Sequence, residues 1–268
     1  MLMARYRIDD EDASVSIEVT DVAGQEQELL EAFGECQAGQ CSCPTEEYQK
    51  LASMDVQHAG DVHAIIEALG AGPVEMFATS GGAVTALALV ATYPSDVTTL
   101  VAHEPPLLAL LPDAAAAERA QRGVRDAYQA KGSGAGMAAF MAMSSWRGEY
   151  TDDYFAQPAP DPAMFGMPAG DDGTREDPLL SDRSWAITSY RPDVDALRAA
   201  PTRVIIAVGE ESAGTVTART SAAIAELLGQ QPTVFPSHHG GFLGGESGYA
   251  GQPEAFARRL REVLDDGT

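Results

Sequence analysis

The stretch "VEMFATSGGAVTALALV", residues 74–90, decides the fold that the sequence predicts. It opens with a short apolar run, reaches Ser80 and two glycines, and continues as a small-residue apolar run of helical character. A strand that turns sharply through a serine into a helix is the local structure of a nucleophile elbow. The usual pattern is G-x-S-x-G, and here Ala78 replaces the first glycine, although it is still small enough for tight strand–helix packing. The stretch therefore makes Ser80 a candidate nucleophile.

Strands and helices alternate on both sides of this stretch. Residues 61–70 form an amphipathic helical pattern, and residues 97–106 form another apolar strand. The alternation resumes with strands at 202–209 and 231–237 and with a closing amphipathic helix at 253–266. Apolar strands alternating with helices are typical of a parallel sheet covered on both faces. The sequence predicts an α/β fold with a mostly parallel sheet.

Residues 107–200 interrupt the alternation with helical stretches and a Pro/Gly/Asp-rich passage at 155–178. An insertion of this kind between strands predicts a helical cap. Its large apolar residues either line a pocket beneath the cap or form the cap's own core. They are Met141, Met143, Trp146, Met164, Phe165 and Met167.

Residues 1–57 form a different segment, which we expect to be an α+β unit beside the α/β domain at 58–268. Strands are predicted at 4–8 and 14–21, separated by an acidic turn, and helical patterns follow at 24–35 and 45–54. The N-terminus lacks a basic region followed by an apolar one, so we do not expect it to be a secretory signal.

The three cysteines, Cys36, Cys41 and Cys43, lie within eight residues of one another. With His58 or His63 as a fourth ligand they would make a Cys₃His zinc site, but the spacing is not a standard one, and reduced thiols on a loop are the alternative. An odd, clustered set does not make a disulfide framework, which favours a cytoplasmic location. No cofactor is expected.

Charge limits the partners of this protein. The chain has 40 acidic and 17 basic residues, which gives a formal net charge of -23. Such a field repels phosphate backbones and anionic lipid surfaces, and no apolar run approaches the roughly 18 residues of a membrane span. We expect a small-molecule substrate, with neither nucleic acid nor membrane as a partner.

Two histidines occupy the place of a catalytic base. His238 and His239 follow the last predicted strand and precede the closing helix. In hydrolases with a nucleophile elbow, the triad runs in the order serine, acid, histidine. His239 fits the last position, with His238 as its rival.

From residue 58 onward, the order of elements and the stretches "LVAHEPP", "DPAMF" and "HHGGFLGGE" resemble α/β-hydrolases, in particular actinobacterial ones of uncharacterised substrate. The resemblance implies that Ser80 is the nucleophile, His239 the general base, and the Gly81 N–H half of an oxyanion hole. It leaves open which of two carboxylates is the acid of the triad. Glu104 corresponds to the position used by haloalkane dehalogenases, just after the strand that follows the elbow, and Glu211 lies near the more usual position. Glu104 is favoured, because a carboxylate at the end of a buried strand is unusual unless it has a function.

The resemblance implies a serine hydrolase that acts on a small ester or related acyl substrate through an acyl-enzyme. The alternative is a non-catalytic relative that binds a small molecule or a protein. A further alternative is a metal-binding regulatory module joined to a vestigial hydrolase.

The family's usual elements before the elbow are missing from this sequence. Before His58 there is neither a His-Gly loop, which supplies the second oxyanion donor, nor a D-x-R-G-like turn. The strand at 74–79 would then be an exposed apolar edge, which favours aggregation. We therefore expect either a homodimer or an N-terminal strand, from residues 4–21, paired with residues 74–79.

Overall fold

The computed structural model describes eight stretches of the chain, and the chain divides into two units, Met1–Ser53 and Met54–Thr268. The described residues are 4–8, 15–19, 54–70, 72–168, 170–177, 179–180, 187–245 and 249–266. In the first unit, β1 (Ala4–Ile8) and β2 (Val15–Val19) form an antiparallel pair, which confirms the two predicted strands. The helix predicted at 24–35, the cysteine loop and all but the last residue of the helix predicted at 45–54 lie outside the described residues.

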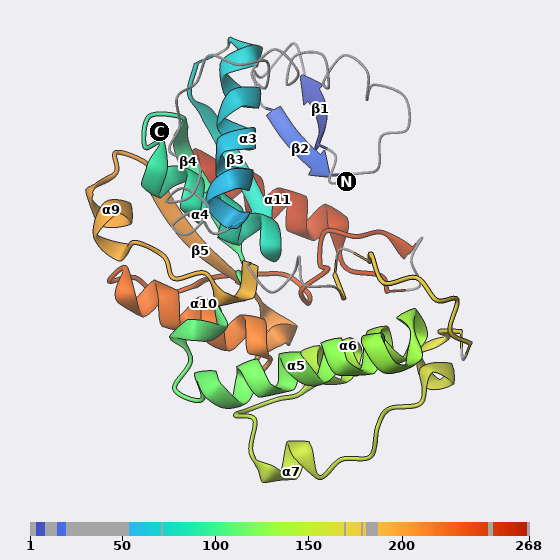
Figure 1. The fold of residues 1–268 in the computed structure, drawn as a ribbon. Helices are drawn as coiled ribbons and strands as arrows, with labels where there is room; N and C mark the ends of the chain where they lie inside the picture. The colour runs from blue at the N-terminus through green and yellow to red at the C-terminus, as the bar shows by residue number, and fades with distance from the viewer. Residues whose placement is uncertain are drawn as a thin grey trace, which may run out of the picture. The chain divides into compact units, whose positions relative to one another are not determined.

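A four-stranded sheet forms the centre of the second unit (Figure 1). Its strands lie in the order β3 (Val74–Thr79), β4 (Val97–His103), β5 (Arg203–Gly209) and β6 (Thr233–Phe235). Every neighbouring pair is parallel, which confirms the predicted α/β class. Strand β6 is shorter than predicted, because the chain leaves the sheet after Phe235 to form the histidine loop.

Helices follow the strands in the expected alternation. They are α3 (Met54–Leu69), α4 (Gly81–Thr92), α9 (Val194–Ala199), α10 (Val216–Leu227) and α11 (Pro253–Asp265). Helix α3 begins four residues before the predicted boundary at residue 58 and packs on α4, which packs on β3 and β4. Helix α4 is apolar almost throughout, which suits its burial between the sheet and α3. On α11, Phe256 and Val263 join a core cluster with Val101 of β4.

The predicted helical insertion lies between β4 and β5. It contains η1 (Leu108–Leu110), α5 (Ala114–Lys131), α6 (Ser133–Ser145), α7 (Asp152–Phe155) and η2 (Pro162–Phe165). Helices α5 and α6 lie side by side (Figure 1) and share a core that includes Tyr128 and Met143. Their close approach requires a glycine at position 136, because a Cβ atom there would lie 2.7 Å from the Cβ of Tyr128. The insertion is therefore a packed cap with its own core.

Strand β3 lies at one edge of the sheet. Among the described strands it pairs with β4 alone, while β1 and β2 pair with each other. The expected pairing of an N-terminal strand with residues 74–79 stays a prediction, as does the homodimer. No helix of that part is long and apolar enough to cross a membrane.

Candidate active site

Ser80 occupies the sharp turn predicted between β3 and α4. Its φ of 54° and ψ of -129° are uncommon for a residue with a side chain. Such strain costs on the order of 1–3 kcal/mol and persists only when the surroundings impose it. The Ser80 N–H donates to the carbonyl of His103 on β4 at 2.9 Å, and the Ser80 carbonyl accepts from the N–H of Ala83 at 3.0 Å. The turn thus holds the serine between the end of the strand and the first turn of the helix.

Glu104 follows β4 directly, beside the elbow, and is fully buried. Its Oε2 lies 2.6 Å from Nδ1 of His239 and accepts a hydrogen bond from the Thr217 hydroxyl, also at 2.6 Å. Its Oε1 accepts from the N–H of Gly209 at 2.9 Å. Burial alone would raise the pKa of this carboxyl, but hydrogen bonds from His239, Ser212 and Thr217 and the charge of His239 lower it to about 2. Glu104 is therefore ionised at neutral pH and holds the His239 ring by one nitrogen.

The alternative acid, Glu211, is not placed to do this. Its side chain is exposed, although the residue lines the same cavity as Ser80 and His239. The described contacts of Glu211 are made by its backbone, whose N–H donates to Ser237 and whose carbonyl accepts from Arg147. No hydrogen bond of the described residues joins Glu211 to His239. The acid that contacts the histidine is Glu104.

The rival histidine, His238, is held in other contacts. Its Nε2 lies 3.2 Å from the carbonyl of Ala250, and its Nδ1 accepts from the N–H of Gly240 at 3.1 Å. Its ring also lies 3.9 Å from the ring of Tyr249, centroid to centroid. Neither nitrogen is therefore oriented by a carboxylate, in contrast to His239.

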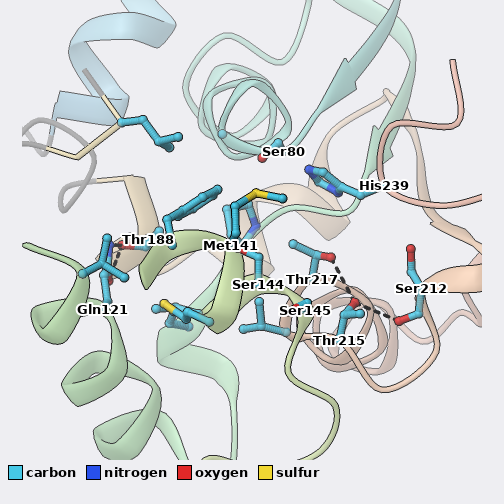
Figure 2. Close-up of a pocket in the computed structure, with 18 of the residues that line it drawn as sticks. Ser80, Gln121, Met141, Ser144, Ser145, Thr188, Ser212, Thr215, Thr217 and His239 are labelled. Carbon is cyan, nitrogen blue, oxygen red and sulfur yellow. Dashed lines mark hydrogen bonds between the residues drawn. The ribbon is translucent and has the colours of Figure 1, made fainter. Parts of the chain in front are cut away.

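Ser80 and His239 line one cavity of about 360 Å³ beneath the cap. Figure 2 shows the His239 ring turned toward Ser80, with Met141 and the polar pair Gln121 and Thr188 along the wall. No hydrogen bond joins Ser80 to His239 among the described residues, and catalytic hydrogen bonds are often long before substrate binds. The cavity therefore presents the serine and the histidine to one bound molecule.

Two of the six apolar residues predicted for a pocket line this cavity. Met141 and Met143 do so, and Met143 also belongs to the cap's core. Trp146 packs against that core, and Met164 is 81% exposed. Phe165 and Met167 do not line the cavity. Both interpretations left open by the sequence are thus partly right, because α6 contributes residues to the cavity wall and to the core of the cap.

Gly81 begins α4, so its N–H belongs to the first turn of a helix, where backbone donors lack partners within the helix and attract anions. A Cβ at Gly81 would lie 3.3 Å from the side chain of Ile187, which places that apolar side chain close to the elbow. The element that precedes β3 is helix α3, and no described His-Gly loop precedes that strand. Gly81 is thus the one recognisable candidate for an oxyanion donor in the described residues.

The proposed zinc ligands Cys36, Cys41 and Cys43 lie outside the described residues. Of the two candidate fourth ligands, His58 lies half-buried on α3, and His63 already contacts Asp96 at 2.7 Å and stacks on Tyr93 at 3.8 Å. Within the described ranges, no group of three or more His, Cys, Asp or Glu side chains could hold a metal ion. The zinc site stays a prediction.

His103 lies at the site, but no role was predicted for it from the sequence. It is fully buried at the end of β4, and its Nδ1 lies 3.1 Å from the Thr79 hydroxyl. Burial lowers its pKa to about 4, against the opposing charge of Glu104, so the ring is neutral at pH 7. A histidine ending an apolar strand, immediately before the candidate acid, was the signal that could have identified it.

No protein-family model matches the chain, and no curated protein matches it. Among solved structures, the chain is similar to BpoC from Mycobacterium tuberculosis H37Rv, a protein that bears the name non-heme bromoperoxidase. The two are 17% identical, the match covers 76% of this chain and 73% of that one, and the TM-score is 0.48. The chemistry of this chain has to be inferred from its own site residues.

Proposed function

We propose that this protein is a serine hydrolase of the α/β-hydrolase type that cleaves a small ester or related acyl compound. The observation that carries the proposal is the contact of 2.6 Å between a buried, ionised Glu104 and Nδ1 of His239. The other nitrogen of that ring is left for the nucleophile, and Ser80 lines the same cavity from a strained turn. A nucleophile, a base and a residue that orients the base are the parts that acyl transfer requires.

The first half of the reaction would acylate Ser80. His239 Nε2 takes the hydroxyl proton as Oγ attacks the carbonyl carbon, and the carbonyl electron pair moves onto oxygen. The N–H of Gly81 donates to that oxyanion. The intermediate collapses, the bond to the leaving alcohol breaks, and the alcohol takes the proton from His239. In the second half a water molecule gives a proton to His239 as it attacks the acyl carbon. The bond between that carbon and Oγ then breaks, Oγ takes the proton from His239, and the acid leaves.

Glu104 would act through His239. A carboxylate on Nδ1 keeps the proton there, so that Nε2 is free to accept a proton from Ser80. It also stabilises the imidazolium that forms during each half-reaction. Its hydrogen bonds from Gly209 and Thr217 hold it in this position without neutralising it.

The cavity favours a neutral and largely apolar acyl group. Side chains from the cap, among them Val124, Phe140 and Leu180, make up much of its wall. The Gln121 amide and the Thr188 hydroxyl, joined at 2.8 Å, add neutral polar atoms. The protein as a whole is acidic and repels anions at long range. The cavity wall also includes Arg125 and Arg147, so a weakly anionic group on the substrate is compatible with the site.

A fluorophosphonate probe tests the proposal. It should label the purified wild-type protein, and the Ser80→Ala variant should stay unlabelled. Ser144→Ala is the matched control, because Ser144 also lines the cavity but contacts neither His239 nor Glu104 in the described structure, so labelling should persist. If the wild-type protein is folded by circular dichroism and yet stays unlabelled, the proposed hydrolase activity is wrong.

One observation favours a second candidate, a binding module built on the same fold. Gly81 is the one recognisable oxyanion donor in the described residues, and the side chain of Ile187 lies beside it. Losing a donor costs about 10²- to 10³-fold in rate. If the probe fails on folded protein, the cavity serves binding, and ligand-induced shifts in melting temperature would identify what it holds.

A further inference from the structure

We propose that Thr79 and His103 form a buried clasp that positions the nucleophile Ser80 and the acid Glu104 relative to each other. The clasp is the side-chain hydrogen bond that joins the last residue of β3 to the last residue of β4. Its catalytic consequence rests on the function proposed above, but the conformational role of the two residues does not.

The register of the two strands places the clasp directly before both functional residues. Thr79 and His103 are Cα partners, the final pair of the β3–β4 ladder. The next residue on each strand, Ser80 on one and Glu104 on the other, has a positive φ, of 54° and 50° respectively. Two strained residues thus leave neighbouring strands at the same level, immediately after a cross-strand side-chain bond.

The backbone around the clasp is also tied across the strands. The Ser80 N–H donates to the His103 carbonyl at 2.9 Å, and the Glu104 N–H donates to the carbonyl of Ala207 on β5 at 3.0 Å. These bonds fix the N–H groups of the two strained residues. The side-chain bond between Thr79 and His103 fixes the residues that precede them. Positive φ values at non-glycine residues persist where the surroundings over-determine them, and the clasp supplies part of that constraint.

The His103 ring is held firmly enough to act as one half of a clasp. It is fully buried and lies 5.4 to 6.5 Å, centroid to centroid, from four phenylalanine rings. Those rings are Phe77, Phe235, Phe242 and Phe256. Its Nε2 has no hydrogen-bond partner in the described structure, so the bond to Thr79 is the polar contact that orients the ring.

The same ring touches the third member of the proposed triad. The rings of His103 and His239 lie 6.0 Å apart at an interplanar angle of 25°. A shift of His103 would therefore change the positions of three residues. It would move Ser80 through the backbone hydrogen bond, Glu104 through the peptide bond that joins it to His103, and His239 through ring packing. Small misplacements of catalytic groups cost rate more than they cost binding.

Three variants test the clasp with a p-nitrophenyl ester as substrate. Thr79→Val removes the hydroxyl while keeping the shape and should lower kcat by about tenfold, with KM changed less than twofold. Thr79→Ser keeps the hydroxyl and should restore kcat to within about threefold of wild type. Thr98→Val is the matched control, because the Thr98 hydroxyl also bonds across the same strands, to the Val74 carbonyl at 3.3 Å, at the end away from the site. It should leave kcat unchanged.

A second measurement does not depend on activity. The proton between His239 Nδ1 and Glu104 should give a low-field proton NMR signal, identified by its loss in Glu104→Gln. Thr79→Val should shift or broaden that signal, while Thr98→Val should leave it in place. If Thr79→Val leaves both kcat and the NMR signal unchanged, the proposed role of the clasp is wrong, while the proposed hydrolase activity still stands. A wild-type protein without activity would overturn the hydrolase, and the NMR signal would still decide the clasp.

Discussion

At the scale of single residues, backbone strain is concentrated around the proposed triad. In the described part of the chain three non-glycine residues have a positive φ: Ser80, Glu104 and Ser237. The first two are the proposed nucleophile and acid, and the third lies two residues before His239. Such strain is typical of functional sites, where the surrounding structure holds a side chain in a conformation it would not adopt alone.

Catalysis should depend more on the charge of Glu104 than on the shape of its side chain. Glu104→Gln keeps the size of the side chain but presents an amide to His239, which no longer favours a proton on Nδ1. We expect kcat to fall on the order of 10³- to 10⁴-fold, as in other triads, with little change in KM. Glu211→Gln is the comparison and should lose far less, because the Glu211 side chain is exposed and does not contact His239. Equal losses in the two variants would contradict the assignment of the acid.

His103 should also make stability depend on pH. The folded protein keeps His103 neutral down to about pH 4, whereas the unfolded chain binds its proton below about 6.5. Because the unfolded state then holds more protons, stability falls as the pH drops from 6.5 toward 4, by as much as about 3 kcal/mol. The depressed pKa of Glu104 adds a further loss between 4.5 and 2.

Urea unfolding at pH values from 7 to 4 measures the effect of His103. His103→Phe suits the aromatic surroundings and cannot be protonated, so its stability should change less with pH than that of the wild type. Parallel curves for the two proteins would show that His103 does not titrate in this way.

At the scale of elements, one ion pair ties the cap to the α/β core. Asp113, which precedes α5, pairs with Arg219 of α10, and both side chains are largely buried. Asp113 also accepts from the N–H of Tyr150 at 2.8 Å, and Arg219 donates to the carbonyl of Gly148 at 2.8 Å. Burial tends to raise the pKa of Asp113, but Arg219 and the Tyr150 N–H lower it. The first turn of α5, the loop before α7 and α10 therefore meet at one pair of charges.

Breaking this pair should loosen the cap. Asp113→Asn should destabilise the protein by about 1–3 kcal/mol, because it leaves a largely buried guanidinium without its counter-charge. Thermal unfolding and limited proteolysis of the segment between α5 and α7 measure the change. Glu262→Gln, which breaks the exposed pair with Arg259 on α11, should have almost no effect. If both variants lose the same stability, the Asp113 pair is not an anchor.

At the scale of the whole molecule, the edge of the sheet predicts a homodimer. Strand β3 is an edge strand among the described residues, with an apolar composition and the elbow at its end. Apolar edges promote unwanted pairing unless something covers them. Sedimentation equilibrium should give twice the mass of 28.2 kDa, and amide exchange across residues 74–79 should speed up as the protein is diluted. A stable monomer with fast exchange in β3 would refute the dimer.

Local sequence was sufficient to predict the elements that position the candidate site. The apolar strand, the serine and the small-residue helix at 74–90 predicted the turn at Ser80, because strand, turn and helix propensities act over a few residues. The helical insertion was predicted for the same reason. The ends of β6 and α3 were predicted less well, since tertiary contacts decide where an element stops.

The sequence by itself determined the parallel α/β class, the elbow and the position of His239, because hydrophobic period and turn residues are local properties. It left Glu104 and Glu211 open, and it gave His103 no role. Tertiary structure determined which of the two carboxylates contacts His239, because hydrogen bonding to that ring depends on which strand ends lie side by side, and β4 lies next to β3. It also brought Thr79 and His103, 24 residues apart in the chain, into the final pair of one ladder. Such contacts arise from strand register, which no single stretch of sequence specifies.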